Sequence, residues 1–145
     1  MKTTILTFTL LFATVFSTTV FAQKKEKDKV LANKTYMVDF TETNAKKPKP
    51  ISDEISFKGE KLNSKFMSQE QHFPAAAYTV SVDSSSSTKT ITFESASKNP
   101  AKEEVKWQGE ISDDAIEGTA TITTKKGKEI QYTFSGNLKP KPGKK

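Results

Sequence analysis

The sequence predicts an all-β protein, an antiparallel up-and-down meander of about eight strands that closes, or nearly closes, into a barrel. Apolar and polar residues alternate with a period of two through most of the chain after residue 30, as in strands with one buried face. Short polar turns separate these runs, and no stretch predicts a helix of convincing length. A sandwich of two sheets is the alternative architecture.

The N-terminal half is expected to begin with a strand over residues 35–41. A strand and hairpin follow over residues 55–66, where Lys58-Gly59-Glu60 forms the turn and the alternation continues as far as Phe66. Between them, residues 44–50 are rich in lysine and proline. This segment should be an exposed loop, because proline has no N–H to donate to a strand ladder.

The C-terminal half continues the same pattern. Polar turns separate five further runs, and the glycines Gly109, Gly118 and Gly136 fall on the apolar side of theirs. At these positions glycine should permit bends or the close approach of neighbouring strands. The five strands are predicted over residues 78–82, 90–94, 105–111, 116–122 and 130–138.

Closure of the sheet is expected from the number of strands. Long strands with one apolar face leave exposed hydrogen-bonding edges when a sheet stays open. About eight strands is also the number at which a closed barrel is either filled by side chains or holds one small ligand.

The N-terminal segment has the three parts of a secretory signal peptide. Lys2 supplies the positive charge, residues 5–15 supply the apolar run, and Val20-Phe21-Ala22 forms a cleavage site before Gln23. No other stretch is apolar enough to span a bilayer. We therefore expect an extracytoplasmic protein, periplasmic or secreted, with no integral membrane segment after cleavage.

Four regions are predicted along the chain. Residues 1–22 form the signal peptide, residues 23–29 a basic disordered tail, residues 30–138 the β-barrel domain, and residues 139–145 a second basic disordered tail. Removing 22 of the 145 residues leaves 123, which is enough for one domain with its own core.

The net charge of +6 does not predict a nucleic-acid partner. The 14 lysines and 15 acids of residues 30–138 give that region a net charge of −1, so the positive excess lies in the tails. The chain has no arginine, the residue that most often contacts phosphates and guanine edges. We expect no nucleic-acid binding by the folded domain.

Residues for catalysis or metal binding are scarce. The absence of cysteine excludes disulfides, a lipid anchor on cysteine, thiol catalysis and thiolate metal ligands. His72 is the single histidine, and no Gly-x-Ser-x-Gly motif accompanies it. The carboxylate pairs Glu103-Glu104 and Asp113-Asp114 are interpreted as solvated charge. We therefore expect neither an enzyme nor a metal or other cofactor.

Several short strand patterns recur in order between residues 56 and 138. They are Phe57-Lys58-Gly59, Ala77-Tyr78, Ile91-Thr92-Phe93-Glu94, Trp107-x-Gly109-x-Ile111, Ile116-Glu117-Gly118 and Tyr132-x-Phe134-x-Gly136-x-Leu138. Together they resemble the patterns of lipocalin-like (calycin-type) small barrels found among uncharacterised secreted bacterial proteins. The resemblance implies an up-and-down barrel whose interior takes a small apolar ligand.

Two functional hypotheses remain open at this point. The first is a binding module for a small apolar ligand in the barrel. The second is a structural or protein-interaction module with a filled barrel and no ligand, whose partner the sequence does not identify. An interior cavity of roughly 300 Å³ or more favours the first, and native packing density favours the second. The predicted ligand-lining residues are Tyr36, Phe57, Phe66, Tyr78, Phe93, Trp107, Tyr132 and Phe134.

Overall fold

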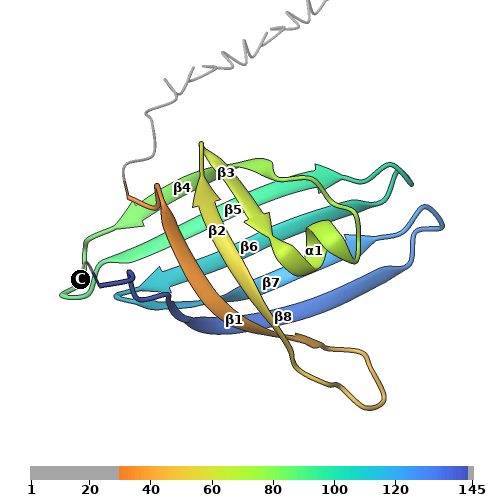
Figure 1. The fold of residues 1–145 in the computed structure, drawn as a ribbon, viewed down its shortest axis with the longest axis horizontal. Helices are drawn as coiled ribbons and strands as arrows, with labels where there is room; N and C mark the ends of the chain where they lie inside the picture. Colours follow the sequence, from red (N-terminus) through yellow and green to blue (C-terminus); the bar gives the residue numbers. More distant parts are fainter. Residues whose placement is uncertain (1–29, 144–145) are drawn as a thin grey trace, which may run out of the picture.

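The computed structural model describes residues 30–143 (Figure 1). The predicted signal peptide, its cleavage site and the basic tail of residues 23–29 lie outside the described residues, as do Lys144 and Lys145. The described chain contains eight strands and one short helix. These are β1 (Lys34–Glu42), β2 (Ile51–Lys58), β3 (Lys61–Ser64), α1 (Lys65–Gln69), β4 (Ala76–Asp83), β5 (Thr90–Lys98), β6 (Glu104–Ser112), β7 (Ala115–Thr123) and β8 (Glu129–Leu138).

The strands form a closed antiparallel barrel in sequence order. Each strand pairs with the next, and β1 pairs with β8 through the register Tyr36↔Leu138 to Glu42↔Tyr132. This confirms the predicted fold class and excludes the two-sheet sandwich. Strands β1, β2 and β3 cross the front of the molecule in Figure 1, with β5 to β8 behind them.

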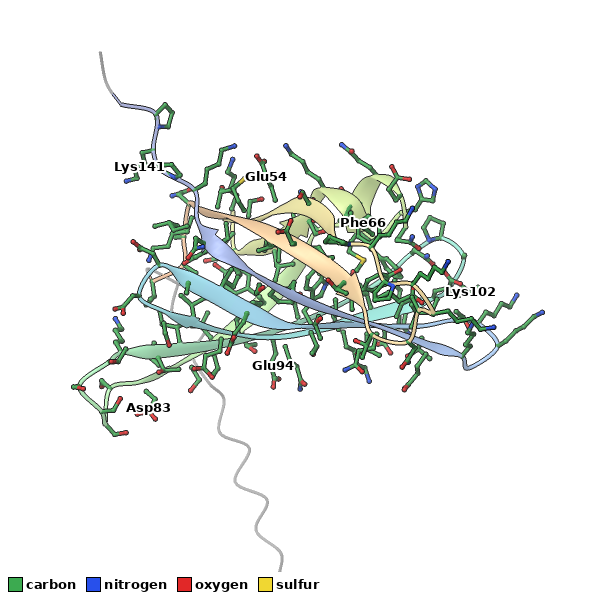
Figure 2. The ribbon with its side chains drawn as sticks, turned by 90° about the horizontal axis from the view of Figure 1, so that it is seen from below. Glu54, Phe66, Asp83, Glu94, Lys102 and Lys141 are labelled. Carbon is green, nitrogen blue, oxygen red and sulfur yellow. The ribbon has the colours of Figure 1, made fainter. Side chains whose placement is uncertain are left out.

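Period-2 alternation sorts the side chains between the interior and the solvent. In β1, Tyr36 and Phe40 are fully buried, whereas Met37 and Asp39 between them are exposed. The same alternation runs through β5 to β8. In Figure 2 the side chain of Glu94 of β5 points outward from the sheet, away from the core. The buried faces of these strands, with the partly buried Tyr78 and Val80 of β4 packed against them, form one apolar core inside the barrel.

The strand glycines permit close approach of neighbouring strands, as predicted. A methyl group on Gly118 would overlap the Gln108 carbonyl oxygen, and one on Gly136 would overlap the Met37 carbonyl oxygen. At Gly109, a methyl group would overlap the ring of Phe93. The missing side chains therefore leave space for backbone and aromatic rings inside the curved sheet.

The predicted strand through Phe66 is wrong at its end. Strand β3 stops at Ser64, and Phe66 lies in helix α1, which the alternation did not predict. Ser64 is extended and caps the helix, because its Oγ accepts a 3.1 Å hydrogen bond from the Met67 N–H. The buried carboxylate of Asp53 holds this turn from β2. Helix α1 lies at one end of the barrel (Figure 1).

The connections agree with the predicted turns. Residues 44–50 form an irregular and mostly exposed loop between β1 and β2. Beyond β8, the Lys139 N–H donates a 2.8 Å hydrogen bond to the Thr35 carbonyl oxygen. Within residues 30–143, no helix is long and apolar enough to cross a membrane.

Candidate functional site

The residues predicted to line a ligand site all belong to the apolar core or pack against it. Phe66 and Tyr78 are partly buried at the two ends of the barrel. The other six are buried: Tyr36, Phe57, Phe93, Trp107, Tyr132 and Phe134.

Half of the interior is occupied by rings in edge and tilted contact. The ring centroid of Phe57 lies 6.1 Å from that of Tyr36, 4.9 Å from that of Tyr78 and 5.2 Å from that of Phe93. Phe93 in turn lies 6.5 Å from Phe134. These separations are typical of packed aromatic pairs, so the rings contact one another and leave little space between them.

Phe40 connects the rings of the other half. Its ring centroid lies 5.4 Å from that of Phe134, 5.9 Å from Trp107, 5.8 Å from Phe66 and 6.4 Å from Tyr132. The ring series therefore runs from Tyr36 and Tyr78 at one end of the barrel to Tyr132 at the other. Phe40 is absent from the predicted lining residues, although its place in the β1 alternation indicates an inward side chain.

A small hollow adjoins the core near the junction of β3 and β4. It has a volume of about 10 Å³ and lies against Met67, Phe73 and Trp107. That volume has room for about one water molecule, compared with roughly 300 Å³ or more for a typical ligand pocket. Fully buried Leu31 lies just before β1, at the end of the barrel opposite α1.

One polar atom within this core has no partner. The hydroxyl group of Tyr36 is buried and makes no hydrogen bond within the described residues. Burial raises the pKa of Tyr36 to about 12, with a smaller contribution from the negative charge of Asp114. The phenol therefore stays neutral until strongly alkaline pH.

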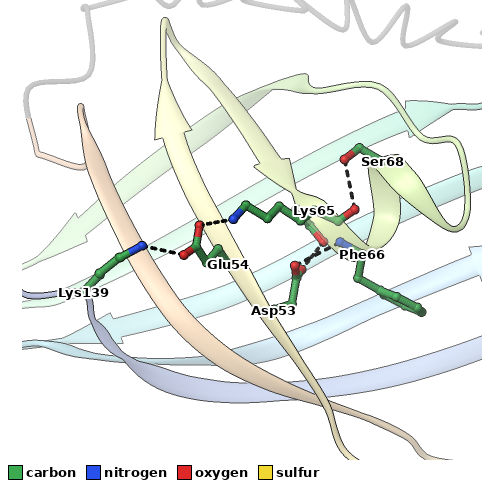
Figure 3. A network of polar contacts seen from close by, with 7 residues as sticks. Asp53, Glu54, Lys65, Phe66, Ser68 and Lys139 are labelled. Carbon is green, nitrogen blue, oxygen red and sulfur yellow. Dashed lines mark hydrogen bonds and ion pairs between the residues drawn. The ribbon is translucent and has the colours of Figure 1, made fainter.

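The buried carboxylate of Asp53 lies next to the start of α1 (Figure 3). Asp53 accepts a 2.5 Å hydrogen bond from the Ser64 hydroxyl and a 3.0 Å hydrogen bond from the Phe66 N–H. Ser64 caps α1 in turn, so these bonds orient the helix that places Met67 against the core. Asp53 has a structural role, because both of its carboxylate oxygens already accept hydrogen bonds from Ser64 and Phe66.

The next residue on β2 makes a separate surface network. Glu54 lies 2.5 Å from the Lys139 ammonium and 2.8 Å from the Lys65 ammonium (Figure 3). Hydrogen bonds from Lys139 and then Lys65 lower the pKa of Glu54 to about 2. This network joins α1, β2 and the end of β8 on the outside of the barrel.

Two larger hollows lie on the outer face of the sheet. One of about 630 Å³ spans β1 and β5 to β8, and an adjoining one of about 520 Å³ extends it toward Ser112 and Asn137. We call the first the acidic saddle. Its outward side chains are Asp39, Thr41, Thr92, Glu94, Gln108, Glu110, Glu117, Thr119, Thr133 and Ser135.

The charge of the acidic saddle is uniformly negative, since no lysine lines it. Glu110 of β6 lies directly opposite Glu117 of β7, and the same row of cross-strand partners continues to Ser135 and Asp39. Like charges directly opposite each other on a sheet are destabilising. Among the described residues, only Asp39 of these acids has a hydrogen-bond donor, the Ser52 hydroxyl at 2.6 Å.

These carboxylates are spread along the sheet. Within residues 30–143, no three His, Cys, Asp or Glu side chains come close enough together to hold a metal ion. The saddle therefore suits several separate positive charges better than one ion. This surface was not predicted from the sequence, although Glu94, Glu110 and Glu117 occupy outward positions of β5 to β7 with no lysine beside them on the sheet.

The residues considered for catalysis lie apart from the aromatic core and from the acidic saddle. His72 is exposed in the turn after α1, and residues 84–87 are exposed between β4 and β5. Glu103 accepts a 3.0 Å hydrogen bond from the Asn99 amide near the start of β6.

Comparisons of this chain with protein-family models, curated proteins and solved structures find no match.

Proposed function

We propose that this protein is an exported, non-catalytic, lipocalin-like barrel that works as a protein-interaction module. Its interior is filled, and its acidic saddle binds a lysine-rich, extended segment of a protein partner. One observation carries the proposal: a contacting series of aromatic rings occupies the interior, while a hollow of about 630 Å³ lies on the outer face. Export is supported by the signal-peptide pattern of residues 1–22.

The shape of the acidic saddle supports an extended partner. The row from Thr92 through Glu110, Glu117 and Ser135 to Asp39 crosses five neighbouring strands. At a spacing of about 4.8 Å between strands, this row is about 19 Å long. A lysine-rich segment in extended conformation covers that length with about six residues, and its ammonium groups can reach several carboxylates.

The hydroxyl groups of the saddle add neutral hydrogen-bonding positions. Thr119 and Thr133 face each other across β7 and β8, and Thr133 faces Thr41 on β1. This row runs beside the acidic one, so a bound backbone finds donors and acceptors next to its charged contacts. Because the acids are exposed, the affinity should fall as salt increases.

Binding of a small apolar ligand in the interior is the alternative function. The observation that favours it is the unpartnered Tyr36 hydroxyl, which could donate to a polar atom of an interior ligand. Such a ligand requires the ring series to move apart, because the hollow beside Met67, Phe73 and Trp107 has a volume of about 10 Å³. The filled barrel needs no such movement.

Titration with tetralysine, monitored by calorimetry at low salt, tests the proposal. The variant Glu110→Gln/Glu117→Gln should bind tetralysine about tenfold more weakly, since exposed charge pairs contribute about 0.2 to 1 kcal/mol each. The control Glu60→Gln/Glu129→Gln removes two exposed acids that lie outside the saddle and should bind nearly as the parent protein does. Equal losses in both variants would show an effect of net charge and contradict a specific surface.

A second titration addresses the interior. A small apolar dye should leave the emission of Trp107 unchanged if the barrel is filled. A saturable change, together with a rise in melting temperature, would support the interior ligand instead. Trp107 does not line the saddle, so the dye titration is read at a residue that the tetralysine measurement does not involve.

A further inference from the structure

Strand β4 has an open side. It pairs with β3 only at Lys61↔Ala77 and Leu62↔Ala76, and then continues to Asp83. Within the described strands, residues 79–83 therefore have a neighbour only on the β5 side. Figure 1 shows the β4–β5 hairpin running past the turn between β2 and β3. Among residues 30–143, a barrel that is closed along most of its length thus keeps a short free edge at this hairpin.

The sequence of this edge is weakly protected against pairing. Lysine, proline, other charges and bulges protect natural edges, whereas residues 79–83 read Thr-Val-Ser-Val-Asp, with Asp83 at the end as their one charge. These residues are mostly β-branched, and Val82 is 42% exposed. The alternation of β4 places Val82 on the same face as Val80. The edge combines unpaired backbone groups with exposed apolar surface.

We propose that this edge is a homodimer interface, in which β4 pairs antiparallel with β4 of a second copy. Residues 79–83 are the part of β4 beyond the β2–β3 hairpin, so the two-fold axis passes through Ser81 at their centre. Val80 then faces Val82 of the second copy, and Thr79 faces Asp83. The same patch serves both subunits, as a two-fold interface requires.

Charge is compatible with this register. The edge carries one charge, Asp83, whose carboxylate accepts a 2.8 Å hydrogen bond from the Ser85 N–H. In the dimer the two Asp83 residues lie at opposite ends of the paired segment, about 13 Å apart at 3.3 Å per residue. At that distance their repulsion is largely screened at physiological salt. A register centred closer to the turn would bring these two acids together.

The size of the interface sets its strength. Stable specific interfaces bury about 1,200 to 2,000 Å² in total, and a pair of five-residue edges buries much less. We therefore expect a weak dimer whose population rises with protein concentration. Sedimentation velocity over a concentration series measures that change directly.

Two exposed apolar residues provide a matched pair of variants for sedimentation. Val82→Lys places a charge on the edge and should give a monomer at all concentrations. Met37→Lys changes a residue of similar exposure, 43% against 42%, on a strand that is paired on both sides, and should dimerise as the parent protein does. A parent protein that stays monomeric throughout, or a dimer that survives Val82→Lys, would overturn the proposal.

Cysteine cross-linking tests the register, since the natural chain contains no cysteine. Ser81→Cys should form an intermolecular disulfide on mild oxidation, because the two copies meet at this residue. Thr79→Cys should cross-link poorly with itself but readily with Asp83→Cys in a mixture of the two variants. Equally efficient self-linking of Thr79→Cys would reveal random collision and contradict the antiparallel pair.

Discussion

Replacing Tyr36 by phenylalanine should stabilise the protein. The Tyr36 hydroxyl is buried and has no hydrogen-bond partner within residues 30–143. A buried polar group without a partner costs about 1 to 3 kcal/mol, and removing one oxygen atom leaves the ring contact with Phe57 in place. We expect Tyr36→Phe to raise the free energy of unfolding at pH 7 by about 1 kcal/mol.

The difference should grow at alkaline pH. The folded-state pKa of Tyr36 is about 12, above its ordinary value of 10.0, because burial disfavours the phenolate. The unfolded chain therefore loses this proton first, and the stability that the neutral phenol provides is lost as pH rises from 10 through 12. At pH 12 this linkage costs the parent protein about 2 kcal/mol, which the phenylalanine variant does not lose.

Urea denaturation at pH 7 and at several values between 9 and 12 measures both effects. Tyr132→Phe is the control at pH 7: its hydroxyl is not among the partnerless buried atoms, so little gain is expected. Destabilisation by Tyr36→Phe at pH 7 would refute the reasoning, because it would mean that the hydroxyl has a partner, such as a buried water. Parallel curves for parent and variant above pH 10 would show that Tyr36 is not shielded from solvent.

Three further substitutions test the core and the α1 end. Asp53→Ala should lower the free energy of unfolding by about 2 to 3 kcal/mol, because two donors of the α1 turn lose a charged acceptor; urea denaturation measures this. Gly136→Ala should lower the free energy of unfolding by more than about 3 kcal/mol, because its methyl group would overlap the β1 backbone. At Gly143 a methyl group would meet open space, so Gly143→Ala should leave the free energy of unfolding unchanged in the same assay. Trp107→Ala should lower the free energy of unfolding by about 3 to 5 kcal/mol, because the indole is buried. The fluorescence of the parent protein should be blue-shifted for the same reason, and emission typical of an exposed tryptophan would mean that the β6 register is wrong.

The fold was predictable because strand periodicity is a local signal. In β8, every second residue from Tyr132 is apolar or glycine, and the structure places Tyr132 and Phe134 inside. The end of β3 was not predictable in this way. Ser64 and Phe66 continue the strand alternation, and helix α1 replaces the strand because Asp53, eleven and thirteen residues away, accepts hydrogen bonds there. A side-chain contact from the neighbouring strand β2 outweighs the local pattern.

The barrel interior and the acidic saddle differ in how far their residues could be predicted from the sequence. The same bulky residues can line a cavity or fill it, so alternation identified the interior positions but could not give their packing. Part of the acidic saddle could have been predicted from the sequence, because the tight turn at Asp113-Asp114 places Glu110 opposite Glu117. The position of Asp39 in the saddle could not have been predicted in this way, because it depends on the pairing of β1 with β8, which lies at the far end of the chain.

A dimer joined through β4 carries two acidic saddles on one continuous outer face. Antiparallel pairing of two edges keeps the outer sides of both sheets on the same side, and each saddle begins on β5, next to β4. Two equivalent surfaces on one face can bind one long cationic segment, and linked binding of this kind increases affinity by about 10² to 10⁴-fold. The dimer should therefore discriminate strongly between short and long partners.

The ratio of two affinities measures this discrimination. Tetralysine spans about 13 Å and reaches one saddle, whereas a 16-residue oligolysine spans about 50 Å and reaches both. At concentrations where the parent protein is dimeric, the affinity ratio of long to short peptide should be at least tenfold larger than in the monomeric Val82→Lys variant. Met37→Lys adds the same charge without touching the edge and should keep the parent ratio. An unchanged ratio in Val82→Lys would show that each saddle binds on its own, whatever the oligomeric state.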